Sequence, residues 1–182
     1  MRAVEISAVV LFLVLLAFAV ADLAIPFIPP ALVAGWLLAD LFSGLVHWAL
    51  DTYGSVRTPV VGPALIRPFR EHHADPAGMT RHDFFEVNGA SCLGCLPLLL
   101  LSFSVDGFLH SLLVCTCLGI LFTNQCHKWA HMDEPPPFVR TLQRFRIVLR
   151  ADEHRLHHTT PYDSHFCTAN GWLNGPLNRL LK

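Results

Sequence analysis

Four apolar stretches constrain the fold of this chain more than any other feature of its sequence. Residues 6–28 contain one charged side chain, Asp22. A helix rises about 1.5 Å per residue, so a helix of this length can cross a hydrocarbon core of about 30 Å. Further apolar stretches cover residues 31–50, 91–105 and 108–126. The sequence therefore predicts an all-α membrane protein with four transmembrane helices in two hairpins.

The composition agrees with a membrane protein and argues against two other classes. Hydrophobic residues make up 53% of the chain and charged residues 15%, whereas soluble domains carry roughly a quarter charged residues. The formal net charge of −1 argues against a protein that binds nucleic acid through basic charge. The apolar content argues against disorder. At 182 residues the chain has room for one domain, which we expect to cover residues 1–182.

The first apolar stretch has one competing interpretation. Ala19-Val20-Ala21 resembles the cleavage site of a secretory signal peptide. The stretch is longer than the apolar region of a usual signal peptide, however, and a second apolar stretch follows at once. We therefore expect it to be a membrane span.

The basic residues predict the orientation in the membrane. All 13 Lys and Arg residues occur at Arg2, within residues 57–81 or from Lys128 onward, and none lies at the expected hairpin tips. The positive-inside rule places such residues in the cytoplasm. We therefore expect cytoplasmic termini and a cytoplasmic cap formed by segments 51–90 and 127–182, in a bacterial inner membrane or the endoplasmic reticulum.

A segment near the C-terminus has the pattern of an amphipathic helix. Phe138, Leu142, Phe145 and Leu149 recur at i, i+4, i+7 and i+11, with arginines between them. This pattern is typical of a helix that lies in the headgroup region with its apolar side toward the lipid. A helix packed on protein would show the same pattern and is the alternative.

Histidine is the unusual residue, with eleven in the chain. His110 follows the hairpin tip on the other side of the membrane, and we expect no chemical role for it; His165 is left unassigned. The other nine gather in four clusters at spacings typical of metal ligands, namely His47 with Asp51, His72 and His73 followed by His82, His127 with His131, and the H-x-x-H-H run of His154, His157 and His158. Such clusters on one face of a membrane predict a metal centre.

The number and type of these residues indicate which metal. One zinc ion takes four ligands, so eight or nine imidazoles predict two metal ions. The absence of an H-E-x-x-H motif argues against a zinc protease. Imidazole-rich sites suit iron or copper, and dioxygen chemistry at a membrane favours iron. Four carboxylates are expected to accept the distal N–H groups of ligating histidines, namely those of Asp51, Asp75, Asp83 and Asp152.

Several motifs resemble the Kua-type membrane lipid desaturases. They are Gly-Leu-Val-His-Trp at 44–48, Arg-Pro-Phe-Arg-Glu-His-His at 67–73, Thr-Arg-His-Asp-Phe at 80–84, Asn-Gln-Cys-His-Lys-Trp-Ala-His at 124–131, His-Arg-Leu-His-His at 154–158, Phe-Cys at 166–167 and Gly-Trp-Leu-Asn at 171–174. The resemblance covers roughly residues 35–175 and is closest to the plasmalogen-forming members of the family.

The resemblance implies a centre of two iron ions that uses O2 and two reducing equivalents. Such an enzyme removes two hydrogens from the alkyl chain of an ether phospholipid, a plasmanylethanolamine, and leaves a vinyl ether. The ligands implied are His47, His72, His73, His82, His127, His131, His154, His157 and His158, and no catalytic residue beyond the metal centre is implied. No bound organic cofactor is expected, so the electrons must come from a separate donor of the cytochrome b5 or ferredoxin type.

The substrate is a membrane phospholipid, and Arg67, Arg70 and Lys128 are candidates for binding its phosphate. Ordinary positive-inside bias would explain these three residues equally well. An alternative within the same chemistry is a desaturase or hydroxylase that acts near the carboxyl end of a phospholipid acyl chain. An alternative of another class is a non-enzymatic metal-handling membrane protein, although transporters usually place their ligands near the bilayer midplane.

Overall fold

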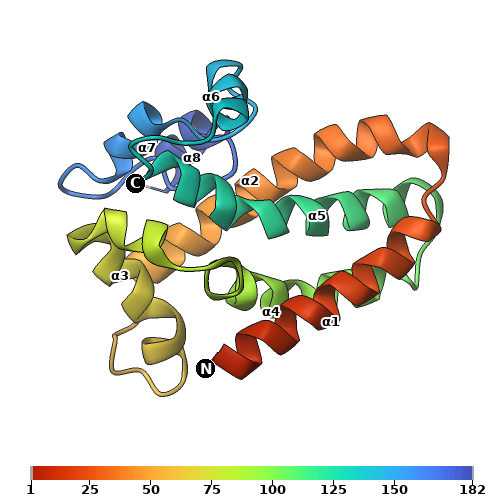
Figure 1. Cartoon of the computed structure of the whole chain (residues 1–182), viewed down its shortest axis with the longest axis horizontal. Coiled ribbons are helices and arrows are strands. Elements are labelled where there is room, and N and C mark those ends of the chain that lie inside the picture. The colour runs from red at the N-terminus through yellow and green to blue at the C-terminus, as the bar shows by residue number, and fades with distance from the viewer. Residues whose placement is uncertain (1, 182) are drawn as a thin grey trace. The chain divides into compact units, whose positions relative to one another are not determined.

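The computed structural model describes residues 2–181, and its regular secondary structure in that range is helical throughout (Figure 1). The contacts divide the chain into two compact units. Unit 1 comprises Met1–Asp40 and His82–Gln125, and unit 2 comprises Leu41–Arg81 and Cys126–Lys182. Helices α2 (Ile28–Thr52) and α5 (Gly107–Ala130) each contribute residues to both units.

Four helices are long and apolar enough to cross a membrane, which confirms the predicted fold class and fits an integral membrane protein. They are α1 (Arg2–Ala21), α2, α4 (Phe84–Ser102) and α5. A 3-10 turn, η1 (Ile25–Phe27), lies between α1 and α2. The interruption between α1 and α2 therefore lies before Pro29 and Pro30. These two prolines occupy the first turn of α2, where the missing N–H of proline costs no hydrogen bond.

Helix α4 begins seven residues earlier than predicted because a capping box starts it. The Asp83 carboxylate accepts hydrogen bonds from the backbone N–H groups of Phe85 at 2.9 Å and Glu86 at 3.1 Å. The Glu86 carboxylate in turn accepts one from the N–H of Asp83 at 3.0 Å. This reciprocal pairing satisfies the free donors of the first turn.

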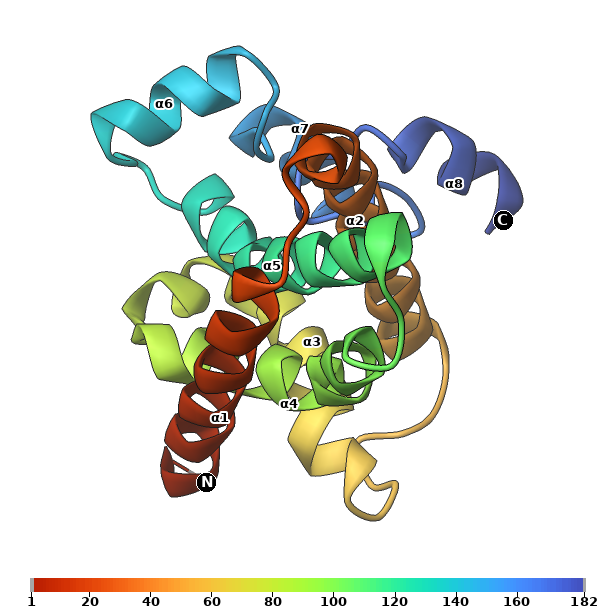
Figure 2. The ribbon, with the colours of Figure 1, turned by 90° about the vertical axis from the view of Figure 1, so that its right-hand side faces the viewer.

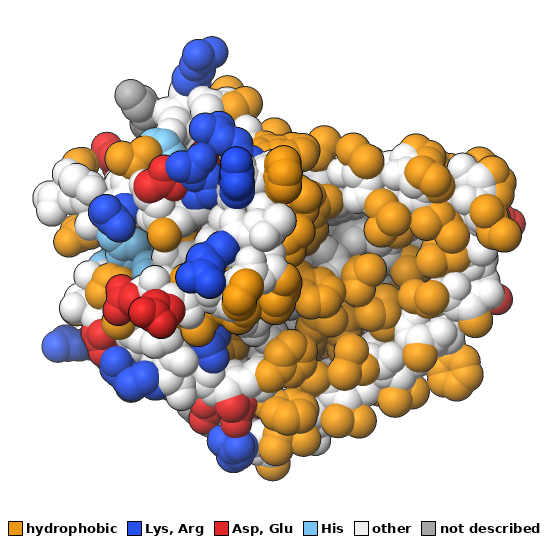
Figure 3. Space-filling view, turned by 45° about the horizontal axis from the view of Figure 1, so that its top comes forward, with side chains coloured by type: hydrophobic (Ala, Val, Ile, Leu, Met, Phe, Trp, Pro, Cys, Tyr) orange, Lys and Arg blue, Asp and Glu red, His pale blue; other side chains and the backbone are white. Residues whose placement is uncertain are grey.

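Small residues allow close helix packing in unit 1. Its apolar core is formed by side chains of α1, α4 and α5, among them Phe12 and Leu99, and α1 lies along α4 (Figure 2). A Cβ atom added to Gly89 of α4 would lie 2.7 Å from the Cβ of Glu5 in α1. Glycine is therefore required where these helices approach each other. Figure 3 shows hydrophobic side chains over the exposed surfaces of the long helices, as expected for contact with lipid.

Unit 2 contains the ends of α2 and α5 and a set of shorter helices. These are the π-helical turn η2 (Gly62–Ile66), α3 (Arg67–Ala74), the 3-10 turn η3 (Pro76–Arg81), α6 (Pro137–Arg144), α7 (Ala151–His157) and α8 (Asn174–Leu180). Its most buried side chains include histidines as well as Val139 and Leu149. The core of unit 2 is therefore partly polar.

The amphipathic segment forms a shorter helix than its periodicity predicts. Helix α6 ends at Arg144, and the chain then turns through Arg146, whose φ is +56°. Leu149 lies beyond this turn and is fully buried, whereas Phe138 and Phe145 are 58% and 68% exposed. The four apolar positions therefore do not share one helix face, although the two phenylalanines remain exposed.

Candidate metal centre

Eight histidines and one aspartate of unit 2 gather in two groups of possible metal donors. The first, called the five-histidine group, consists of His72, His127, His131, His154 and His158. The second, called the mixed group, consists of His47, Asp51, His73 and His157. Within each group, one donor atom per residue lies within 4.8 Å of every other.

Helical spacing explains how some of these side chains come together. His47 and Asp51 stand four residues apart in the last turns of α2, and both belong to the mixed group. His127 lies in the last turn of α5 and His131 follows the helix, and both belong to the five-histidine group. Residues four apart on a helix lie on one face, so each pair presents its donors in one direction.

Neighbouring histidines are divided between the two groups. His72 joins the five-histidine group and His73 the mixed group; likewise His158 joins the former and His157 the latter. Successive residues of a helix point about 100° apart, so each dipeptide serves both groups. The ring centroids of His157 and His158 are 5.2 Å apart, and those of His73 and His158 are 5.3 Å apart. The two groups are therefore adjacent, as a pair of metal ions would require.

The spacing of donor atoms fits metal coordination. In the five-histidine group, Nε2 of His72 lies 3.0 Å from Nε2 of His127, and Nε2 of His154 lies 3.1 Å from Nε2 of His158. In the mixed group, Oδ2 of Asp51 lies 3.1 Å from Nε2 of His73, 3.4 Å from that of His47 and 3.5 Å from that of His157. Two ligands about 2.1 Å from one metal and at right angles are about 3.0 Å apart. Both groups match this separation.

Two histidines of the mixed group are oriented by backbone carbonyls. Nδ1 of His47 lies 3.0 Å from the carbonyl oxygen of Phe166, and Nδ1 of His157 lies 2.8 Å from that of Ser164. A carbonyl only accepts hydrogen bonds, so each Nδ1 must carry the proton and each Nε2 a lone pair. Both Nε2 atoms are buried and have no hydrogen-bond partner. A bound metal ion would satisfy them.

Burial also keeps the nitrogens of the candidate ligands neutral. Burial foremost, together with the like charges of nearby histidines, lowers the pKa of His72 to about 2. The same causes lower the pKa of His158 to about 3, and burial foremost lowers that of His131 to about 4. Imidazoles with such pKa values are unprotonated at neutral pH, so their lone pairs are available to a metal.

The predicted carboxylates occupy different environments. Asp51 lies among three histidines and is a possible ligand itself rather than only a hydrogen-bond acceptor. Asp75 pairs with Arg81 at 2.5 Å, and Asp152 pairs with Arg150. Asp83 belongs to unit 1, where it caps α4 and pairs with Arg2 at 2.7 Å. The structure thus brings one of the four carboxylates to the histidines of unit 2.

His82 also belongs to unit 1 and is not among the two groups found in the described part of the chain. Its side chain is 60% exposed, and its Nδ1 lies 3.3 Å from the Glu86 carboxylate. Its role as a ligand stays a prediction. The carbonyls of Ser164 and Phe166 were not predicted, because backbone atoms leave no signal in a sequence.

A cavity of about 660 Å³ lies beside the mixed group. Asp51 and His73 line it together with Arg70 and aromatic side chains, including Trp48 and Tyr162. Nη2 of Arg70 donates to the carbonyls of residues 53 and 54, both at 3.2 Å, while its buried Nε has no partner. Of the three cations predicted to bind phosphate, Arg70 is the one that lines this cavity; Arg67 is exposed and Lys128 is half-buried near the end of α5.

The sequence is similar to that of known proteins over most of its length. Residues 36–181 match the family model described as the lipid desaturase domain. The chain is 50% identical over 153 residues to plasmanylethanolamine desaturase of Myxococcus xanthus, covering 81% of this chain and 54% of that protein. It is 46% identical over 164 residues to plasmanylethanolamine desaturase 1 of Mus musculus, covering 84% and 60%.

A third relative carries a different name. The chain is 38% identical over 153 residues to the chloroplastic fatty acid desaturase 4 of Arabidopsis thaliana, covering 80% of this chain and 46% of that protein. The chain thus spans about half the length of these curated relatives. No solved structure matches it significantly.

Proposed function

The chain belongs to the lipid desaturase domain family, and we propose that its unit 2 holds two iron ions and desaturates the alkyl chain of an ether phospholipid. The product would be the vinyl ether of a plasmalogen. Two adjacent donor groups with unpartnered buried nitrogens support this proposal. The names of two relatives at 50% and 46% identity support the choice of substrate, plasmanylethanolamine.

Each of the two groups would hold one metal ion. The five-histidine group would hold one iron and the mixed group the other. When bound, the iron pair would supply with O2 an oxidant strong enough to cleave an unactivated C–H bond, which no side chain can do. The carbonyls of Ser164 and Phe166 would keep two imidazoles in the correct tautomer, and burial would keep water away from the ligands.

The reaction needs electrons from outside the substrate. Reduction of O2 to two water molecules takes four electrons and four protons. The substrate gives two electrons and two protons as its C–C bond becomes C=C, and the remaining two electrons would come from a separate donor of the cytochrome b5 or ferredoxin type. The remaining two protons would come from water.

The cavity beside the mixed group suits the polar end of the lipid. Arg70 would bind the phosphate there, with Arg67 and Lys128 as further phosphate-binding candidates. The first carbon of the alkyl chain lies only a few atoms from the glycerol phosphate, so an anchored headgroup would place that carbon near the metals. The positive-inside rule supports cytoplasmic termini in a bacterial inner membrane or the endoplasmic reticulum.

Expression in cells that make alkyl-ether lipids but no plasmalogens tests the proposal. Acid releases an aldehyde only from vinyl ethers, so we expect an aldehyde signal with the chain and none with the H158A variant. H158A protein should remain in the membrane fraction. An aldehyde signal equal to that of the unmodified chain would remove His158 from the centre.

A second candidate function follows from the relative named as a fatty acid desaturase. In that case the double bond or a hydroxyl group would appear near the carboxyl end of an acyl chain, and acid would release no aldehyde. Lipid mass spectrometry of the same cells separates the two outcomes. Purified protein that contains zinc and oxidises no lipid would instead indicate a metal-handling protein.

A further inference from the structure

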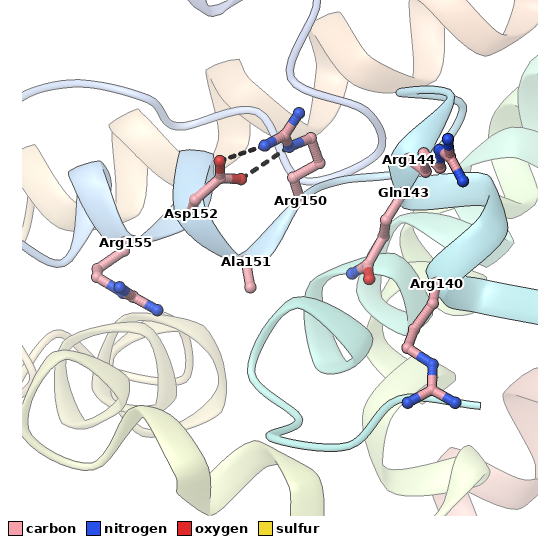
Figure 4. A pocket seen from close by; sticks show the side chains of 7 residues that line it. All are labelled: Arg140, Gln143, Arg144, Arg150, Ala151, Asp152 and Arg155. Atoms are coloured by element: carbon pink, nitrogen blue, oxygen red, sulfur yellow. Dashed lines mark hydrogen bonds and ion pairs between the residues drawn. The ribbon is translucent and has the colours of Figure 1, made fainter. Parts of the chain in front are cut away.

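A shallow groove of unit 2 collects arginines outside the two donor groups. It has a volume of about 450 Å³ and is lined by Arg140 and Arg144 of α6 and by Arg150, Asp152 and Arg155 at and within α7. Figure 4 shows these side chains around the groove. We call it the arginine groove.

The charge of the arginine groove is not balanced by its own residues. Asp152 is its one acidic lining residue, and both of its carboxylate oxygens are held by Arg150, with Nε at 2.8 Å from Oδ1. Arg140, Arg144 and Arg155 make no ion pair within residues 2–181. About three positive charges therefore remain in one concave surface, which attracts and orients an acidic partner.

The groove also lies next to the candidate ligands. Helix α7 carries His154 and His157, and the groove residue Arg155 directly follows His154 in the chain. An electron that arrives at the groove would therefore have only a short covalent path to a ligand of the five-histidine group.

The orientation of α6 favours a soluble partner over the bilayer. Phe138 is 58% exposed and is the residue of α6 most suited to contact lipid. At about 100° per residue, Arg140 and Arg144 lie about 200° and 240° around the helix from Phe138. The arginines thus occupy the opposite side of α6 from its exposed phenylalanine, so that a helix lying with Phe138 in the lipid would direct its arginines toward water.

We propose that the arginine groove docks a small acidic redox protein that supplies the two electrons of the reaction. This inference rests on the proposed function. Each docking event would oxidise one carrier by one electron, so each turnover would oxidise two carriers. With these two electrons, one O2, two protons and one lipid CH2–CH2 group become two water molecules and one C=C bond. Complexes of this kind are small and transient, which suits a groove of this size.

The test uses the full chain, loaded with iron in lipid nanodiscs, and two acidic one-electron carriers as probes, a plant-type ferredoxin and the soluble haem domain of a cytochrome b5. The variant R140E/R155E reverses one charge on each helix of the groove. We expect its bimolecular rate of carrier oxidation to fall about 10-fold or more at low salt, with a weaker dependence on ionic strength. The variant R140K/R155K, which keeps both charges, should retain most of the rate.

A matched control and a chemical bypass make the result decisive. R57E/R179E makes the same charge change at two exposed positions outside the groove and should leave the rate unchanged. Dithionite replaces the carrier, so R140E/R155E should keep its iron and its single-turnover product with dithionite. Failure of the unmodified chain with dithionite would refute the proposed function rather than the docking.

Four results would overturn the docking proposal. One is a carrier rate in R140E/R155E equal to that of R57E/R179E. The second is transfer from neither carrier to the unmodified chain although dithionite supports turnover. The third is loss of iron from R140E/R155E, which would assign the arginines to holding α7 in place. The fourth is weaker binding to vesicles of anionic phospholipid with an unchanged carrier rate, which would assign the groove to the membrane.

Discussion

Buried histidines occur in both units, but their surroundings differ. In unit 1, His110 is 5% exposed, and its two ring nitrogens lie 2.8 Å from the carbonyl oxygen of Ser102 and 3.0 Å from that of Ala19. In unit 2, His47 is 1% exposed, and its Nδ1 faces the Phe166 carbonyl while its Nε2 has no hydrogen-bond partner. Burial alone therefore does not distinguish a candidate ligand; a nitrogen without a hydrogen-bond partner that lies among other donor atoms does.

The same difference extends to other polar groups. In unit 1, the hydroxyls of Ser102 and Thr116 donate to carbonyls of their own helices, both at 2.7 Å. In unit 2, buried nitrogens of His131, His154 and His157 have no hydrogen-bond partner. Each such atom costs about 1–3 kcal/mol when it stays unsatisfied. Unit 1 satisfies its buried polar side chains largely through its own backbone, whereas unit 2 leaves buried nitrogens that a bound metal ion would satisfy.

The largest expected effect separates the two kinds of buried histidine. H47A removes a candidate ligand and should reduce vinyl ether formation by about 100-fold or more, since even residues that only orient metal ligands contribute about 10–100-fold. H110A should keep both its iron and its vinyl ether product, although it loses stability. Iron analysis and lipid mass spectrometry of the two purified variants check this contrast. Full turnover by H47A, or loss of iron from H110A, would break it.

A second substitution sharpens the comparison within unit 2. Asp51 is the one carboxylate of the mixed group, and D51N keeps its size but removes its charge. We expect the variant to bind one equivalent of Co²⁺, used as a spectroscopic probe, where the metal-free unmodified chain binds two. The five-histidine group should remain occupied in D51N. Two equivalents bound with unchanged affinity would show that Asp51 is not a ligand.

The smallest expected effect concerns unit 1 alone. D83A removes the cap of α4 and its pairing with Arg2. Loss of a helix cap costs about 1 kcal/mol, so faster amide hydrogen exchange is expected in the first turns of α4. The iron content of unit 2 should not change, and the variant would thus show that the two units can be perturbed separately. Iron loss in D83A would link the α4 cap to metal binding.

Much of the fold follows from the sequence because hydropathy is summed over long stretches. Four spans were predicted correctly, but their ends depend on local interactions. The start of α4 could have been read from the Asp83-x-x-Glu86 pattern, which is a capping box. The end of α6 could not, because nothing in the sequence marks Arg146 as a residue with positive φ.

The sequence predicts which residues belong to the candidate site better than it predicts how they are arranged. The i, i+4 spacing of His127 and His131 brings both into one group, as expected. The division of His72 from His73, and of His157 from His158, depends on how separate helices meet. Asp51 reaches three histidines only through contacts with distant segments. Such placement depends on tertiary contacts and leaves no signal in the local sequence.

Metal analysis with Mössbauer spectroscopy of the purified full chain, expressed with ⁵⁷Fe, tests the central claim most directly. We expect two irons per chain, with spectra that show two sites in different ligand environments, one with imidazole nitrogens alone and one that includes a carboxylate oxygen. A folded, membrane-inserted chain that binds a single iron, or only zinc, would contradict the assignment of a two-iron centre to these residues.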